Sequence, residues 1–223
     1  MSTAPARAAR TPAAKPLKRP SQARARFTVQ AIYDAFVRIW QRDGWERLTT
    51  RAVALETGIS VGTLYDYFPN KTALLSGYVR HSVDVLLAEI ERQAVQPAGL
   101  AWPQRVRTLV RLACGVEAPE LPWFHPGMLT LEAQIAEPKH HRRVHEELLA
   151  AWGRVLDACT DLPARPSRDT LQALHLAVWG GRRYALLVGL QAQEAGRWAA
   201  QMERCCLAAL QAPEDPALRI IAA

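Results

Sequence analysis

Apolar residues at helical spacing are the feature of this 223-residue chain that most restricts its fold. After Thr28 they recur at positions i, i+3, i+4, i+7 and i+8, which is the pattern of one helix face. The first such set comprises Ile32, Ala35, Phe36, Ile39 and Trp40. No convincing alternation of apolar and polar residues, the pattern of a half-buried strand, interrupts this periodicity. We therefore predict an all-α fold.

Glycine and cap residues divide the first part of the chain into four helices. Gly44 and Gly58 follow helical patterns, where a left-handed residue ends a helix. Ser60 and Asn70 each precede a new pattern, as side chains that cap a helix N-terminus do. The predicted helices cover residues 28–43, 51–57, 61–67 and 71–93.

The rest of the chain continues the helical pattern with clear breaks. The Pro-rich segments 117–126 and 162–166 interrupt it. The predicted helices there cover residues 103–116, 127–137, 138–160, 167–192 and 196–212. We predict an N-terminal domain over residues 27–80, a larger helical domain over 81–212 and a flexible tail over 213–223.

The net charge of +7 lies in the N-terminal segment. Residues 1–26 contain seven basic residues and no acidic one, whereas the remainder is nearly neutral. Their high proline content and scarcity of apolar side chains predict a disordered arm. A basic arm on a neutral body indicates a polyanionic partner, either nucleic acid or an anionic surface. The arm is interpreted either as solvated chain or as a contact to DNA phosphates or the minor groove.

Several other classes of protein and site are disfavoured. No run of about 18 apolar residues is present, so we expect no membrane span and no membrane partner. The four cysteines form no CxxC pair, which indicates reduced thiols and a cytoplasmic location. His141 and His145 have a zinc-compatible spacing, but the neighbouring Arg142 and Arg143 disfavour a cation. We therefore expect no metal, no cofactor and no catalytic site.

The two short helices around Gly58 satisfy the rule for a helix-turn-helix. Gly58 permits the sharp turn, and Ala54 and Leu64 supply apolar contact between the helices. The second helix would present its N-terminal side chains to the major groove. The exposed set suited to this task is Val61, Gly62, Thr63, Tyr65 and Tyr67. Spacing alone leaves open a helical hairpin within an α-helical enzyme.

The run LTTRAVALETGISVGTLYDYFPNKTALL, residues 48–75, closely resembles the DNA-binding signature of the TetR family of transcriptional regulators. The matching elements are the Thr-Thr pair, Gly58, Ser-x-Gly-Thr-Leu-Tyr-x-Tyr-Phe over residues 60–68, and Lys71 before Leu74-Leu75. The resemblance covers about residues 27–80, and the remainder matches only in layout. It implies a DNA operator as partner and Leu64 and Phe68 as core residues.

The resemblance also implies DNA contacts at eight positions. Thr50, Tyr65, Tyr67 and Lys71 would bind phosphates, Arg51 a phosphate or base, and Val61, Gly62 and Thr63 would face bases. Lys71 has a physical reason of its own, since the N-terminus of a helix favours an anion.

In the family, the second domain binds a small molecule and dimerises through its last two long helices. The corresponding segments here are residues 167–192 and 196–212, although an intramolecular core is the alternative interpretation of their apolar faces. Aromatic and polar residues suggest a site for an unknown apolar or aromatic effector. The candidate ligand-binding residues are Trp102, Trp123, Phe124, His125, Met128, Trp152, His175, Trp179 and Tyr184.

Three functions therefore compete. The first is a homodimeric, ligand-responsive regulator, expected to be a repressor, that binds a palindromic operator. The second is an α-helical enzyme or ligand carrier with a structural trihelical unit. The third is a DNA-compacting protein that acts through the basic arm without sequence preference.

Overall fold

The computed structural model describes residues 23–211, and these residues form ten α-helices and one π-helical turn without a strand. The predicted all-α class is confirmed. Most of the predicted arm (residues 1–22) and the end of the chain (residues 212–223) lie outside the described residues. Between Ala23 and Gln211, no helix combines the length and the apolar character that crossing a membrane requires.

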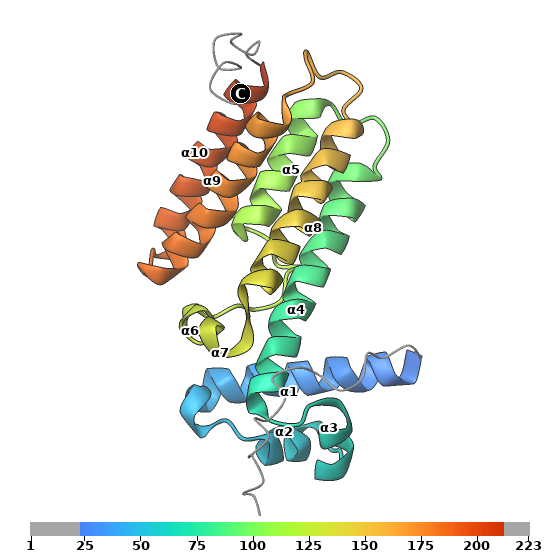
Figure 1. The fold of residues 1–223 in the computed structure, drawn as a ribbon, viewed down its shortest axis with the longest axis vertical. Helices are drawn as coiled ribbons and strands as arrows, with labels where there is room; N and C mark the ends of the chain where they lie inside the picture. Colours follow the sequence, from blue (N-terminus) through green and yellow to red (C-terminus); the bar gives the residue numbers. More distant parts are fainter. Residues whose placement is uncertain (1–22, 212–223) are drawn as a thin grey trace, which may run out of the picture. The chain divides into compact units, whose positions relative to one another are not determined.

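The described residues divide into two compact units. Unit 1 comprises residues 23–80 and 132–135, and unit 2 comprises residues 81–131 and 136–211. Unit 1 contains α1 (Ala23–Arg47), α2 (Thr50–Thr57), α3 (Val61–Tyr67), the first half of α4 (Lys71–Ile90) and the short α7 (Glu132–Ile135) (Figure 1).

The observed start of α1 differs from the sequence prediction. The helix begins at Ala23 rather than near Thr28, so residues 23–26, which we assigned to the arm, are helical. The predicted interruption at Gly44 is present, because this residue has φ 76° and ψ 172° inside the span assigned to α1. The helices predicted over residues 51–57 and 61–67 correspond to α2 and α3.

An aromatic cluster forms the core of unit 1. Phe36 is fully buried, and its ring lies 5.5 Å from that of Trp40 and 5.1 Å from that of Tyr78. Leu64 and Phe68 of α3 are also buried, as predicted, and Phe68 contacts the ring of Tyr33 at 5.7 Å. These contacts fix one face of α3 in the core and leave its other face to solvent.

Unit 2 contains the second half of α4 and most of the remaining helices. They are the π-helical turn η1 (Glu91–Val95), α5 (Trp102–Cys114), α6 (Pro126–Thr130), α8 (Pro138–Asp157), α9 (Arg168–Leu187) and α10 (Ala192–Gln211). The prediction of one continuous helix over residues 127–137 is wrong, because the chain breaks at Leu131 into α6 and α7. The helix predicted over residues 71–93 is α-helical only as far as Ile90.

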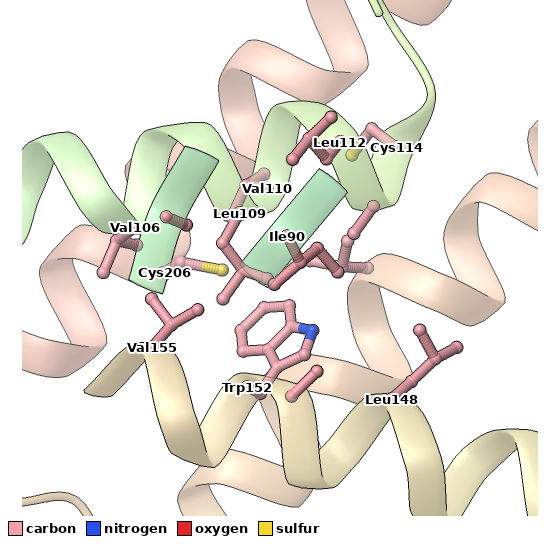
Figure 2. Close-up of a cluster of buried hydrophobic side chains, with 14 of the residues drawn as sticks. Ile90, Val106, Leu109, Val110, Leu112, Cys114, Leu148, Trp152, Val155 and Cys206 are labelled. Atoms are coloured by element: carbon pink, nitrogen blue, oxygen red, sulfur yellow. The ribbon is translucent and has the colours of Figure 1, made fainter. Parts of the chain in front are cut away.

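Trp152 lies at the centre of the unit 2 core. Its side chain is 1% exposed, and Figure 2 shows it projecting from α8 toward Ile90 and Leu109. Burial of a side chain of this size contributes several kcal/mol. Cys114 and Cys206 are free thiols in the same core, where desolvation raises the pKa of each to about 12. These cysteines therefore act as small apolar side chains, as we expected.

Two close contacts fix the helices of unit 2. A Cβ atom on Gly181 of α9 would lie 2.5 Å from the ring of Trp198 in α10, so this approach requires glycine. Arg105 is buried, and its guanidinium donates to the carbonyls of Ala94, Val95 and Pro97 at 2.7–2.9 Å and of Leu100 at 3.2 Å. Arg105 thereby ties the connector after η1 to α5.

Candidate nucleic-acid interface and effector region

The turn between α2 and α3 is built from local backbone and cap contacts. The Thr49 side chain accepts a hydrogen bond from the Ala52 N–H at 3.1 Å and so caps α2. Gly58 ends α2 in the left-handed conformation, with φ 75°, and the Ile59 N–H donates to the Ala54 carbonyl at 3.0 Å. This geometry is that of a helix-turn-helix.

The N-terminus of α3 combines a capped backbone with an open surface. Ser60 Oγ accepts from the Thr63 N–H at 2.9 Å and lies 2.8 Å from Thr63 Oγ1. Thr63 is half-buried, whereas Val61, Gly62 and Tyr65 are exposed, with 37% of Val61 and 45% of Tyr65 accessible. The open surface is mainly apolar and hydroxyl-bearing, the type that contacts thymine methyl groups and phosphates.

Two hydroxyl groups from different helices meet beside this surface. Thr50 Oγ1 at the start of α2 and the Tyr65 hydroxyl on α3 are 3.2 Å apart. Arg51, which follows Thr50, is exposed. The structure therefore brings three predicted phosphate contacts onto neighbouring positions of α2 and α3, while Tyr67 is half-buried and its ring lies 6.4 Å from that of Phe68.

Lys71 has partners within unit 1. Its Nζ donates to the Trp45 carbonyl at 3.3 Å and lies 4.5 Å from the centre of the Trp45 ring. Asn70 caps α4, because its Oδ1 accepts from the Ala73 N–H at 2.7 Å. Sequence reasoning did not identify the Trp45 contact, which positions the Lys71 ammonium at the N-terminus of α4.

An ion-pair network joins α1 to α2. Arg38 and Arg42 bind the two carboxylate oxygens of Glu56 at 3.0 and 3.2 Å. The hydrogen bonds from Arg38 and Arg42 lower the pKa of Glu56. Both arginines are thus held by intramolecular contacts, and α3 itself carries no basic residue.

The predicted effector residues fall into two groups in unit 2. Trp152 and His175 are buried with their ring centres 6.1 Å apart, and the half-buried Trp179 packs against the same core. Met128 is buried on α6, which lies against α9. The half-buried Trp123 lies 5.6 Å from the ring of His125, and Phe124 between them is half-buried.

The remaining predicted effector residues have other surroundings. Tyr184 is 69% exposed, on the opposite face of α9. His125 is exposed and caps α6 by accepting from the Gly127 N–H at 3.0 Å. Trp102 lies at the start of α5, where its backbone N–H donates to the Asp161 carboxylate beyond the end of α8, and its side chain packs against the same core as Trp179.

His175 has an unusual environment for a polar residue. It is 1% exposed, and its Nε2 atom has no hydrogen-bond partner. Its ring lies 5.0 Å from that of His145. Desolvation, with a smaller contribution from His145, lowers the pKa of His175 to about 4, so the imidazole is neutral at pH 7. Within the described residues, His145 is not part of a metal-ligand cluster.

The α2–α3 geometry is that of a helix-turn-helix, the motif that many DNA-binding proteins use. A sequence model of the tetR family of bacterial regulatory proteins matches residues 32–77. Over these residues the chain is similar to the TetR family of transcriptional regulators.

Similarity to curated relatives covers a minor part of the chain. The transcriptional repressor KstR of Mycobacterium tuberculosis is 38% identical over 79 residues, which are 35% of each chain. The nucleoid occlusion factor SlmA of Haemophilus influenzae is 43% identical over 47 residues, or 21% of this chain and 22% of that protein. The match thus spans about a third of KstR and a fifth of SlmA.

The solved structures extend the likeness to most of the fold. The crystal structure of a TetR-family regulator from Mesorhizobium loti matches with a TM-score of 0.60 and covers 85% of this chain and 96% of that one. Its sequence identity is 18%, so this likeness concerns the fold alone.

Proposed function

We propose that the protein is a ligand-responsive transcriptional repressor that binds a palindromic DNA operator as a homodimer. The observation that carries this proposal is the two-sided character of α3. Leu64 and Phe68 are buried, whereas Val61, Gly62 and Tyr65 are open to a partner. The repressor activity of the relative KstR supports repression as the direction of control.

Base and phosphate contacts would be divided between α2, α3 and the start of α4. Val61 and Gly62 would approach base edges, and Thr63 would do so with a hydroxyl already oriented by Ser60. The paired hydroxyls of Thr50 and Tyr65 would bind phosphate, together with Arg51, Tyr67 and Lys71. Because α3 has no cation, affinity would depend on these flanking groups and on the basic arm.

The homodimer would form through α9 and α10. Leu176, Tyr184 and Leu187 recur at helical spacing on α9 and are 49%, 69% and 53% exposed. Gly180 lies on the same face and would allow a close helix approach. An exposed apolar stripe of this length is typical of a surface that another chain covers. Two recognition helices would then meet half-sites about 34–36 Å apart.

The effector would bind in unit 2, in contact with the inward face of α9. The unpartnered Nε2 of His175 and the neighbouring Trp152 and Trp179 support a ligand that is apolar or aromatic and bears a hydrogen-bonding group. Binding would favour a conformation that no longer fits the operator.

Selection of bound sequences from a random duplex pool tests the proposal. The expected result is a two-fold symmetric consensus whose half-sites are one helical turn apart. A Tyr65→Ala, Thr63→Ala variant should recover no consensus, whereas a Thr160→Ala variant, at an exposed position of unit 2, should recover the parental one. Sequence-independent retention of the pool by the parent protein would contradict operator recognition and favour a DNA-compacting role.

A further inference from the structure

Arg182 is a guanidinium on the inward face of α9. It follows His175 by seven residues and Val178 by four, which is the spacing of one helix face. His175 and Val178 are both buried, and Arg182 itself is half-buried. The exposed Leu176 and Tyr184 lie on the other side of the helix. Arg182 therefore points into unit 2 and away from the stripe proposed for dimerisation.

The contacts of Arg182 leave most of its donors unused. One nitrogen donates to the Ala113 carbonyl at 3.4 Å, longer than an ordinary N–H···O bond. The other terminal nitrogen is 2.9 Å from the position that a Cβ atom on Gly115 would take, and the guanidinium carbon is 5.4 Å from the centre of the Trp179 ring. In the span from Ala23 to Gln211, no carboxylate lies within ion-pair distance of this side chain.

Other arginines of unit 2 show how guanidinium groups are satisfied in this fold. Arg107, Arg111 and Arg154 each pair with a glutamate at 2.9–3.1 Å. Arg105, which is buried, has four backbone carbonyls within 3.2 Å. Arg182 has neither arrangement.

The position of Arg182 favours an incoming anion. Burial lowers the pKa of this guanidinium, which means that the charged form is poorly solvated where it lies. The carbonyl end of α5 offsets part of this cost through the helix dipole but supplies only one long hydrogen bond. A planar carboxylate would accept two parallel N–H···O bonds from the guanidinium.

A second, independent observation lies on the same helix face. The Nε2 atom of His175 is buried without a partner, two helical turns from Arg182, or about 10 Å along the axis. Val178 and Trp179 separate the two polar groups. One face of α9 thus presents an unpartnered imidazole nitrogen and an incompletely hydrogen-bonded guanidinium at the ends of an apolar and aromatic surface.

We propose that Arg182 is the anion-binding residue of the effector site, and that the effector is an apolar or aromatic carboxylate. This inference rests on the proposed function, because that function places an effector in unit 2. The carboxylate would bind the Arg182 guanidinium beside the Trp179 ring, and its apolar body would extend along α9 toward His175.

The test compares carboxylates with their uncharged primary amides. The probes are benzoate, 2-naphthoate and decanoate, each with its amide, and binding is followed by tryptophan fluorescence and thermal melting of the full chain. The parent protein should bind at least one carboxylate more tightly than its amide. The Arg182→Gln variant should bind that carboxylate about tenfold or more weakly than the parent does. The exposed Arg204→Gln, which removes the same charge from α10, should leave the preference unchanged.

Additional variants and probes distinguish an anion-binding role of Arg182 from a purely structural role at the C-terminal end of α5. Arg182→Lys keeps a charge at the end of α5 but lacks the planar fork, so it should stay folded and lose most of the carboxylate preference. Equal binding of every carboxylate and its amide, or equal stabilisation by inorganic phosphate, would overturn the proposal. A carboxylate preference that Arg182→Gln and Arg182→Lys both retain would overturn it as well.

These outcomes are distinct from failure of the proposed function. Operator binding by the parent protein without any probe tests the function, whereas carboxylate preference without DNA tests the anion site. If the amides release the operator as well as the carboxylates do, the result would support ligand-responsive repression and contradict the proposed role of Arg182.

Discussion

At the scale of single residues, the hydroxyl groups of α3 are the most direct test of DNA recognition. Tyr65→Phe removes the hydroxyl that lies 3.2 Å from Thr50 Oγ1, and Thr63→Ala removes the one oriented by Ser60. Each change should weaken specific operator binding by about 1–3 kcal/mol, because a hydrogen bond to phosphate or base is lost. Fluorescence anisotropy with the selected operator measures this effect.

The matched control is Thr160→Ala, since this threonine is exposed in unit 2 and lies outside the proposed sites. It should bind the operator like the parent. Because Tyr65 is 45% exposed, its variant should keep the parental melting temperature. Parental affinity in both α3 variants would contradict the assignment of α3 as the recognition helix.

The lowered pKa of His175 predicts that the stability of the folded protein depends on pH. Its pKa is about 4 in the folded protein against 6.5 for the unperturbed group, so between these values the unfolded chain binds a proton that the folded chain does not. Stability should therefore fall as pH decreases from about 6.5 to about 4, by an amount on the order of 3 kcal/mol. His175→Phe should flatten this dependence, as measured by urea denaturation at pH 7, 5.5 and 4.5.

His141→Gln is the control for the histidine prediction, because His141 is exposed on α8. It should retain the parental pH dependence. An equally steep loss of stability in the His175→Phe variant would contradict the assignment of this effect to His175.

At the scale of the helices, two glycines of the helix-turn-helix should respond in opposite directions. Gly58 has φ 75°, so Gly58→Ala is strained even though the space around it is open, and it should destabilise the protein by about 1–2 kcal/mol. Gly62 lies inside α3, where an added Cβ atom would be 3.7 Å from Ser60 Oγ, an ordinary contact distance, so Gly62→Ala should stabilise the protein by about 0.5–1 kcal/mol. Gly62→Ala should nevertheless weaken operator binding, because the added methyl group keeps the α3 backbone from the bases.

Thermal melting and operator titration of the two alanine variants distinguish these effects. A stabilised Gly62→Ala protein with parental DNA affinity would mean that the α3 backbone does not approach the bases closely. A Gly58→Ala protein as stable as the parent would contradict the strain argument.

The success of sequence reasoning differed between elements for physical reasons. The bounds of α3 were predictable, because Ser60 is a side-chain cap and Pro69 prevents the helix from continuing. The break at Leu131 and the π-helical turn after Ile90 were not, since neither follows from a glycine or proline at that point. At the sites, the Lys71–Trp45 contact spans 26 positions and needs the fold to become visible.

For Arg182, the sequence predicts the helix face on which the residue lies but not the contacts of its guanidinium. Its spacing from His175 indicates a shared helix face, yet spacing does not show whether an acidic partner lies beside the guanidinium. Conversely, Tyr184 was chosen for its chemistry, and the structure exposes it on the opposite face. The candidate interface of α2 and α3 was therefore more predictable than the effector region.

At the scale of the whole molecule, DNA binding should depend on dimerisation. Leu176→Glu, Leu187→Glu places two charges in the exposed stripe of α9, where they would be desolvated at a helix–helix interface. We expect this variant to sediment as a monomer and to lose most of its operator affinity, because a monomer contacts one half-site. Ala150→Glu, at an exposed position of α8, is the control and should remain dimeric.

The two units are covalently joined by α4, and this continuity makes coupling between effector and operator a testable property. The first ten residues of the helix, from Lys71, belong to unit 1, and the last ten, ending at Ile90, belong to unit 2. Ile90 packs in the same core as Trp152, while Lys71 lies at the N-terminal end beside α3. A ligand that shifts the unit 2 core would therefore act on the helix that carries a proposed phosphate contact.

We expect effector and operator to be mutually antagonistic, and linkage fixes the relation between the two effects. If a ligand weakens operator binding by a given factor, the operator must weaken binding of that ligand by the same factor, typically about 5- to 150-fold. The measurement is tryptophan fluorescence titration of a bound carboxylate with and without saturating operator, paired with operator titration at saturating carboxylate. Unequal factors would point to a further equilibrium such as dissociation of the dimer. Equal ligand affinities in the presence and absence of operator would leave a DNA-binding protein whose unit 2 site does not control it.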